Sequence, residues 1–419
     1  MKNFILYGVA TGFNRASAFI IIPLLSPLLT VDDFGSFTLY MIAVQFFVPF
    51  LSLNISSIIA REAIENWRTT LNFVIAFNKL SGLFVLLLSI VILIKANIIF
   101  LAVFYAMLEA IFLVNTTLIR FKSKVEYFFI FSLMKLILLA LLLGIAWVLS
   151  FRLLEDINYL ILIFALSNIV IIFPYSKITF KFNFGLHGII KYLQKNKGML
   201  FFALSLLPHI VAQWVISGSD RFIINLFSNN DELGIYSFAY SVAAIFMLIN
   251  SALALGMPQY CVNHYEYYST KAFYKKYFIV ISVLWLLFVG AILSVFPYFP
   301  EKYSYEKALP VFLLVALGMY FLSFYYYFSS IIFYERKAKE LSLITIKVAV
   351  INVIVAFLLT LWLGILGTAL STTISYFIYT FMAFSWVKKH RSVNNLAFPA
   401  IFALLVSVVI IVYMWLKFN

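Results

Sequence analysis

The sequence has little charge, few acidic residues and almost no cysteine. Only 11% of its 419 residues are charged, with 16 Asp and Glu against 30 Lys and Arg. This excludes an ordinary soluble domain, in which about a quarter of the residues are charged. The one cysteine, Cys261, excludes an internal disulfide, and we expect its thiol to have no functional role.

The sequence is instead rich in hydrophobic residues. They make up 65% of the chain, in runs long enough to cross a hydrocarbon layer of about 30 Å as helices. We expect an all-α polytopic membrane protein, because backbone groups in lipid must find their hydrogen bonds within the protein. Twelve predicted helices form two sets of six, and a thirteenth follows them. Their ranges are 4–29, 37–60, 71–94, 97–119, 127–150, 157–175, 199–224, 233–256, 277–297, 308–333, 341–363, 366–387 and 396–416.

The loops between these helices indicate an orientation. With the N-terminus in the cytoplasm, the inner segments carry 20 Lys and Arg and the outer segments carry six. This is the bias of the positive-inside rule, so we expect a cytoplasmic N-terminus. The net charge of +14 then reflects membrane topology, and we expect no nucleic-acid partner.

A short phrase occurs twice. VDDFGSF begins at Val31 and NDELGIY begins at Asn230, and their glycines, Gly35 and Gly234, lie 199 residues apart. Each phrase falls in the predicted outer loop after the first helix of a set. The repeat predicts two parallel six-helix lobes related by a pseudo-two-fold axis along the membrane normal. We expect each glycine to permit a tight turn back into the membrane.

A second repeat supports the same division. Lys135 follows Lys124 by eleven residues, and Lys347 follows Arg336 by eleven. The predicted parts are an N-lobe at 1–175, a basic cytoplasmic linker at 176–198, a C-lobe at 199–388 and an additional transmembrane helix at 396–416. Residues 175–198 contain five lysines and no acid. They are typical of an interfacial segment bound to anionic headgroups, and a docking site for a partner or a lipid headgroup is the alternative.

Four cations lie inside apolar helices, where each costs roughly 2.5–3.5 kcal/mol on insertion scales. They are Arg15, Lys79, Lys135 and Lys347. One acid, Glu109, lies as deep. Because one acid cannot neutralise four cations, we expect the rest to face water or an anionic ligand. Snorkelling to the interface is the alternative for each cation. Glu109 is either the neutralising partner of one cation or a proton-coupling carboxylate.

Other polar residues lie in the first helix of each lobe. Asp220 and Arg221 are adjacent, and we expect separate partners for them because neighbours on a helix do not face each other. A role at the lobe interface is expected for this pair. The remaining candidates for the cavity or lobe interface are Asn14, His209 and Gln213.

Four segments resemble the polysaccharide flippases of the multidrug/oligosaccharidyl-lipid/polysaccharide (MOP) exporter superfamily. They are LLSPLLTVDDFGSFTLY, LSLNISSIIAREA, SDRFIINLFSNNDELGIYSFAY and GILGTALSTTISY, in that order. The short length, lysine-rich loops and lobe plan are most similar to the Wzx-type O-antigen flippases of Gram-negative bacteria. The resemblance implies a MATE-like fold that works by alternating access.

The resemblance also implies a function. Such proteins move undecaprenyl-pyrophosphate-linked oligosaccharide units from the inner to the outer leaflet of the bacterial inner membrane. Arg15 fills the place of a basic residue that recurs in the family's first helix. The expected partners are this lipid-linked oligosaccharide, the phospholipid bilayer and other polysaccharide-assembly membrane proteins. We expect no cofactor, no metal site and no catalytic residue.

Two other functions remain open. A polytopic glycosyltransferase or O-antigen polymerase would use acids such as Asp32 and Asp33, but the duplication of these acids at Asp231 and Glu232 argues against a catalytic role. A MATE-like exporter of cationic drugs would carry acids in its cavities, and here the helix interiors are net basic, which disfavours a cation.

Overall fold

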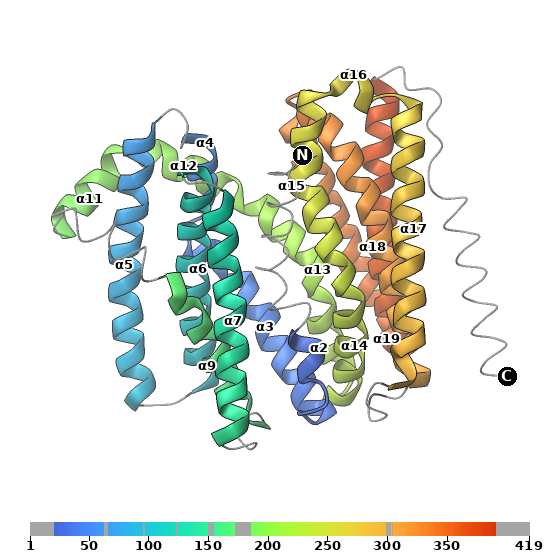
Figure 1. The fold of residues 1–419 in the computed structure, drawn as a ribbon, viewed down its shortest axis with the longest axis horizontal. Helices are drawn as coiled ribbons and strands as arrows, with labels where there is room; N and C mark the ends of the chain where they lie inside the picture. The colour runs from blue at the N-terminus through green and yellow to red at the C-terminus, as the bar shows by residue number, and fades with distance from the viewer. Residues whose placement is uncertain are drawn as a thin grey trace. The chain divides into compact units, whose positions relative to one another are not determined.

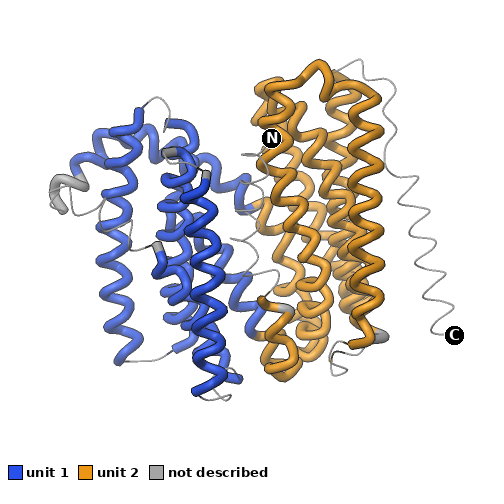
Figure 2. Tube along the Cα trace, in the orientation of Figure 1, with its two compact units in different colours: residues 1–14, 37–211 blue, residues 15–36, 212–419 orange. Residues whose placement is uncertain are grey.

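The computed structural model describes residues 21–62, 66–94, 97–122, 125–149, 155–171, 186–298, 303 and 305–390. They divide into two compact units (Figure 2). Unit 1 takes Phe37–Val211, and unit 2 takes the described residues up to Ser36 and those from Ala212 onward. Unit 1 thus includes the described part of the predicted linker, whereas the lobe boundaries at 175 and 199 stay a prediction.

The helices of unit 1 are shown in blue to green in Figure 1. They are α3 (Val31–Leu51, in this unit from Phe37), α4 (Ile55–Glu62), α5 (Trp67–Ile94), α6 (Ile98–Lys122), α7 (Val125–Leu149), α9 (Ile157–Ser167), the 3₁₀ turn η2 (Asn168–Ile171), α11 (Leu186–Lys195) and α12 (Lys197–Ser205).

Unit 2 contains the later helices and one short early helix. They are α2 (Ile22–Leu25), α13 (Leu207–Phe227, in this unit from Ala212), α14 (Asn230–Ala243), η3 (Ala244–Phe246), α15 (Met247–Asn263), α16 (Tyr265–Tyr268), α17 (Lys271–Val295), η4 (Phe296–Tyr298), α18 (Tyr305–Tyr334) and α19 (Ala338–His390).

The prediction of a polytopic helical membrane protein is confirmed. Nine helical segments of the described chain are long and apolar enough to cross a membrane, and Ile157–Val170 is a shorter apolar helix. The longest segment, α19, contains two predicted helices, because Gly364 at φ 58° and ψ −137° turns the chain in its middle. Predicted helices two to twelve therefore all have counterparts. The first falls mostly, and the thirteenth wholly, outside the described residues.

The fourth helix of each predicted set lies at the centre of its unit. In unit 1, α6 packs against α4, α5, α7 and α9. In unit 2, α18 packs against α14, α15, α17 and α19, and it is buried along most of its length. A helix that is apolar on every face is stable when neighbours surround it, which explains why these two helices are central.

The second predicted helix, 37–60, is broken in the structure. Leu53 and Asn54 adopt left-handed backbone conformations at φ 49° and 48°, which end α3 before α4 begins. Asn is among the residues that tolerate this conformation best. The Asn54 side-chain amide also donates a hydrogen bond of 2.9 Å to the Ala203 carbonyl on α12, so the break attaches α12 to unit 1.

The repeated glycines have a different role from the predicted tight turn. Gly35 lies in α3 and Gly234 lies in α14, and neither has a positive φ. A Cβ atom on Gly234 would lie 2.1 Å from the Val31 carbonyl oxygen, and one on Gly35 would lie 2.8 Å from the Gly234 nitrogen. The two copies of the phrase pack backbone to backbone within unit 2, and only glycine permits this approach.

The acids of both phrases also lie in helices. Asp32 and Asp33 are in the first turn of α3, and Asp231 and Glu232 are in the first turn of α14. Carboxylates are favourable there, because they compensate the positive end of the helix dipole. The expected outer loop is therefore the start of a helix in both copies.

Candidate functional site

Two ion pairs with a buried cation lie among the helices of the described chain, one in each unit. In unit 1, Lys135 on α7 donates hydrogen bonds of 3.0 and 2.8 Å to the two carboxylate oxygens of Glu109 on α6. The Lys135 Nζ atom also lies 4.4 Å from the ring centroid of Phe112. Lys135 is 3% exposed, whereas the Glu109 side chain is 27% exposed. The ammonium is thus sealed within the unit and the carboxylate is partly accessible.

An amide pair links α5 to α6 in the same unit. Asn78 on α5 and Asn115 on α6 donate to each other at 3.0 Å in both directions, and Asn115 also donates to the Ile111 carbonyl at 2.8 Å. Both amides are buried, and such groups stay buried only when they are hydrogen-bonded. Lys79, the predicted site residue next to Asn78, is partly exposed.

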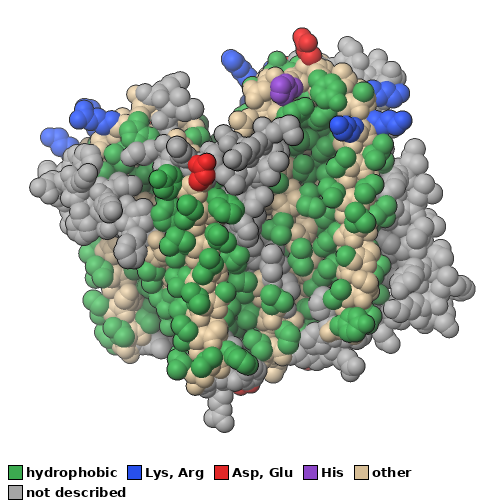
Figure 3. Space-filling model, in the orientation of Figure 1, with side chains coloured by type: hydrophobic (Ala, Val, Ile, Leu, Met, Phe, Trp, Pro, Cys, Tyr) green, Lys and Arg blue, Asp and Glu red, His purple; other side chains and the backbone are tan. Residues whose placement is uncertain are grey.

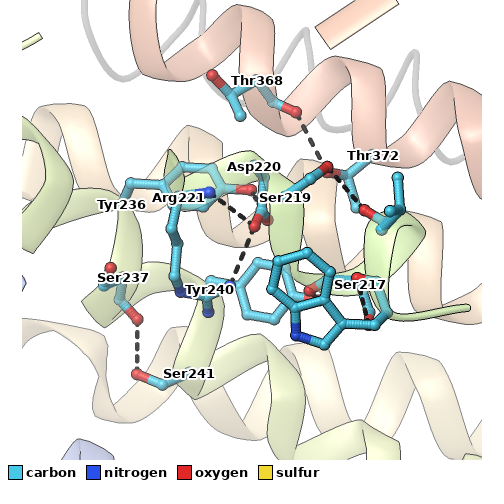
Figure 4. A network of polar contacts seen from close by, with 12 residues as sticks. Ser217, Ser219, Asp220, Arg221, Tyr236, Ser237, Tyr240, Ser241, Thr368 and Thr372 are labelled. Atoms are coloured by element: carbon cyan, nitrogen blue, oxygen red, sulfur yellow. Dashed lines mark hydrogen bonds and ion pairs between the residues drawn. The ribbon is translucent and has the colours of Figure 1, made fainter. Parts of the chain in front are cut away.

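In unit 2, Asp220 and Arg221 on α13 form the second pair (Figure 4). Asp220 Oδ1 accepts from the Arg221 backbone nitrogen at 2.8 Å and from Arg221 Nη1 at 3.2 Å. Asp220 Oδ2 accepts from the Tyr236 hydroxyl on α14 at 2.5 Å. Both charged residues are 4% exposed. The carboxylate is therefore saturated by donors from two helices.

The expectation of separate partners for Asp220 and Arg221 is wrong in part. The guanidinium is long enough to fold back onto the adjacent carboxylate, so the two residues do pair. Each also has a further neighbour, since the Arg221 Cζ atom lies 4.2 Å from the ring centroid of Tyr240. Tyr240 donates in turn to the Ser217 carbonyl at 3.1 Å. Arg221 Nε has no hydrogen-bond partner among the described residues.

The other predicted site residues lie in different environments. Lys347 on α19 is exposed from unit 2, between Leu343 and Val350, which are 40% and 56% exposed. Gln213 is exposed, and His209 is partly exposed, with a buried Nδ1 that lacks a partner among the described residues. Two residues, Asn14 and Arg15, lie outside the part of the chain that the structure describes.

Sequence reasoning did not identify the neutral residues that complete the two pairs. In unit 1 this residue is Phe112, and in unit 2 they are Tyr236 and Tyr240. The separate amide pair of Asn78 and Asn115 was not identified either. A signal was present, since Tyr236 and Tyr240 are four residues apart and share a helix face, and both asparagines interrupt long apolar runs. Within the described residues, no three His, Cys, Asp or Glu side chains cluster as metal ligands would.

Comparisons with solved structures place this arrangement of helices among known transporters. The lipid II flippase MurJ in an inward closed conformation matches with a TM-score of 0.65 and 16% identity, covering 99% of this chain and 92% of that one. A multidrug resistance MATE transporter of the MOP superfamily, in an inward-facing conformation, matches with a TM-score of 0.60 and 15% identity, covering 94% and 96%. A multidrug resistance MATE transporter of the MOP superfamily in an outward-facing conformation gives a TM-score of 0.60 and 13% identity, covering 94% and 97%.

Comparisons of sequence find nothing similar. No family model matches the chain, and no curated protein matches it. At such low identities the structural matches establish the fold alone. The protein is a multi-pass helical membrane protein with the fold that MATE transporters and MurJ share.

Proposed function

We propose that the protein is a flippase for lipid-linked oligosaccharides. The observation that carries this proposal is an excess of cations inside a chain with a transporter fold. Among residues at least six positions from either end of a described span, four are cationic and two are acidic. The cations are Lys79, Lys135, Arg221 and Lys347, and the acids are Glu109 and Asp220. A surplus of positive charge within the membrane-spanning segments favours an anionic substrate, such as a pyrophosphate.

The finer assignment follows from the resemblance of the sequence. We propose a Wzx-type flippase that moves undecaprenyl-pyrophosphate-linked O-antigen or a similar repeat unit from the cytoplasmic to the periplasmic leaflet of a bacterial inner membrane. The N-terminus would lie in the cytoplasm, as the distribution of loop cations indicates. Alternating access would be the mechanism by which the lipid-linked unit crosses.

The cations would have different roles in this function. We propose that Lys347, Lys79 and Arg15 contact the pyrophosphate, since Lys347 is exposed from its unit and Lys79 is partly exposed. Lys135 would contribute only when the pyrophosphate competes with Glu109, whose carboxylate is partly open. The Asp220–Arg221 pair is saturated and buried, so we assign it to the integrity of unit 2.

Transport in proteoliposomes tests this proposal. The purified protein would be reconstituted with undecaprenyl-pyrophosphate oligosaccharide, and a membrane-impermeant glycosidase would report the fraction of substrate in the outer leaflet. We expect the wild type to equilibrate the two leaflets and Lys347→Gln to slow this exchange. The matched control is Lys271→Gln, which removes an exposed lysine at the start of α17.

Each alternative outcome has a distinct meaning. Wild-type exchange no faster than in protein-free liposomes would show that the flippase proposal is wrong. Elongation of the oligosaccharide would indicate a polymerase, and accumulation of an organic cation would indicate a drug exporter. Exchange that Lys347→Gln leaves unchanged would keep the function and remove Lys347 from the site.

A further inference from the structure

Unit 1 contains an apolar groove beside a basic helix. The groove has a volume of about 280 Å³ and lies between the end of α3, helix α5 and the segment α11–α12. Its partly open lining includes Phe50, Leu53, Leu80 and Phe84, which are 36–40% exposed. The one polar side chain that lines it, Ser81, donates its hydroxyl to the Asn78 carbonyl at 3.1 Å. The groove therefore favours hydrocarbon.

The shape of the groove suits a chain rather than a compact ligand. The α5 residues that line it begin at Phe73 and end at Phe84, and they recur at helical spacing along one stripe. Eleven residues of α-helix correspond to about 16 Å at 1.5 Å per residue. An elongated apolar site of this kind matches a hydrocarbon tail lying along the helix.

A hydrogen bond and an aromatic contact attach the basic segment to α5 at the edge of the groove. Tyr192 on α11 donates to the Thr69 carbonyl at 3.0 Å, and its ring centroid lies 5.4 Å from that of Phe73. Burial raises the pKa of Tyr192 to about 12, so its hydroxyl remains a donor at neutral pH. Leu193 on α11 and Leu200 on α12 complete the apolar wall.

The same segment carries positive charge that forms no ion pair among the described residues. Lys191, Lys195 and Lys197 are exposed, and the sequence from 175 to 198 has no acid. A second cavity of about 120 Å³, lined in part by α12, has a neutralised cation instead, because Arg61 there pairs with Glu62 at 3.2 Å. Figure 3 shows Lys and Arg side chains at this end of unit 1, above sides covered by hydrophobic residues. The segment that supplies Leu193 and Leu200 to the groove thus also carries the three exposed lysines.

We propose that this site binds an anionic phospholipid, with one acyl chain in the groove and the phosphate among Lys191, Lys195 and Lys197. Lys191 and Lys195 precede the span Lys197–Phe227 and Lys197 begins it, so a headgroup of the surrounding bilayer would meet them at the end of that span. The lipid would be a resident of unit 1, and the proposal does not depend on the transport proposed above.

Native mass spectrometry of the delipidated full-length protein tests the site. Dioleoyl phosphatidylglycerol and dioleoyl phosphatidylcholine, which have the same chains, are added at equal concentration. We expect the wild type to bind the anionic lipid about tenfold or more better, as contact with several lysines would give. Undecaprenyl phosphate, the carrier lipid, is added as a competitor. It also combines a phosphate with a hydrocarbon chain, so it tests which of the two lipids the site prefers.

Two pairs of matched variants locate the binding. The triple variant Lys191→Gln, Lys195→Gln, Lys197→Gln should lose the preference, whereas Lys271→Gln, Lys275→Gln, Lys276→Gln in unit 2 should keep it. Leu80→Trp should block the groove, whereas Leu83→Trp changes an exposed residue of the same helix that does not line it. Leu80→Phe replaces Leu80→Trp if the latter lowers the melting temperature.

Several results would overturn the proposal. Equal binding of the two phospholipids by the wild type would remove the headgroup site. Equal loss in both triple variants would show a nonspecific charge effect, and unchanged binding after the groove is blocked would exclude the acyl chain. Displacement of the phospholipid by an equal concentration of undecaprenyl phosphate would assign the groove to the carrier lipid instead.

Discussion

Lys135 in unit 1 and Lys347 in unit 2 occupy corresponding places in the repeat, 212 residues apart, yet they lie in opposite environments. Lys135 is 3% exposed and bound to Glu109, whereas Lys347 is exposed on α19. The same offset aligns Glu109 on the central helix α6 with Phe321 on the central helix α18. The difference follows from the central helices, because α6 places a carboxylate against Lys135, whereas Lys347 forms no ion pair among the described residues.

The largest effect should follow from Glu109→Gln, which removes the carboxylate and leaves the Lys135 ammonium buried. Breaking one partner of a buried ion pair costs about 3–5 kcal/mol, which we expect as a loss in the free energy of unfolding. Thermal unfolding in detergent would measure it as a marked fall in the melting temperature. An unchanged melting temperature would mean that Lys135 is not sealed within unit 1.

Gly234→Ala should destabilise unit 2 where the two copies of the repeated phrase pack against each other. The added methyl group would meet the Val31 backbone, and overpacking of this kind costs about 1–3 kcal/mol. Gly290→Ala on α17 is the control, because its Cβ would meet nothing within 4 Å, and it should stabilise by up to about 1 kcal/mol through helix propensity. Melting temperatures that shift in the same direction would contradict the close packing.

Replacing both Glu109 and Lys135 separates the cost of an unpaired buried charge from the contribution of the pair to packing. The double variant Glu109→Leu with Lys135→Leu removes both charges together, so no uncompensated charge remains in the interior. Apolar replacement of a buried pair is often neutral or stabilising by 1–4 kcal/mol. We therefore expect the double variant to melt well above Glu109→Gln. A double variant as unstable as the single one would show that the pair is needed for packing itself.

The smallest effect on stability should come from Lys347→Gln. An exposed side chain away from caps and ion pairs changes stability by about 0.5 kcal/mol or less. The expected result is an unchanged melting temperature together with slower transport in the assay described above. A large loss of stability would indicate that Lys347 has a structural partner comparable to Glu109.

The helical class, the order of predicted helices two to twelve and the break between residues 363 and 366 could all be predicted from the sequence. Hydrophobic runs and helical rise are local properties, so they can be read from neighbouring residues. The repeat of acids and glycine was also visible, but it predicted outer loops with tight turns, whereas both copies lie in the first turns of helices.

The contacts that those residues make could not be predicted from the sequence and are seen in the structure. It paired Lys135 with Glu109, folded Arg221 back onto Asp220, and brought Gly35 against Gly234 instead of into a turn. It also joined α11 and α12 to unit 1 and formed the groove there. These outcomes depend on which helix faces meet across long separations in sequence, and periodicity places a residue on a face without naming the helix that this face will meet.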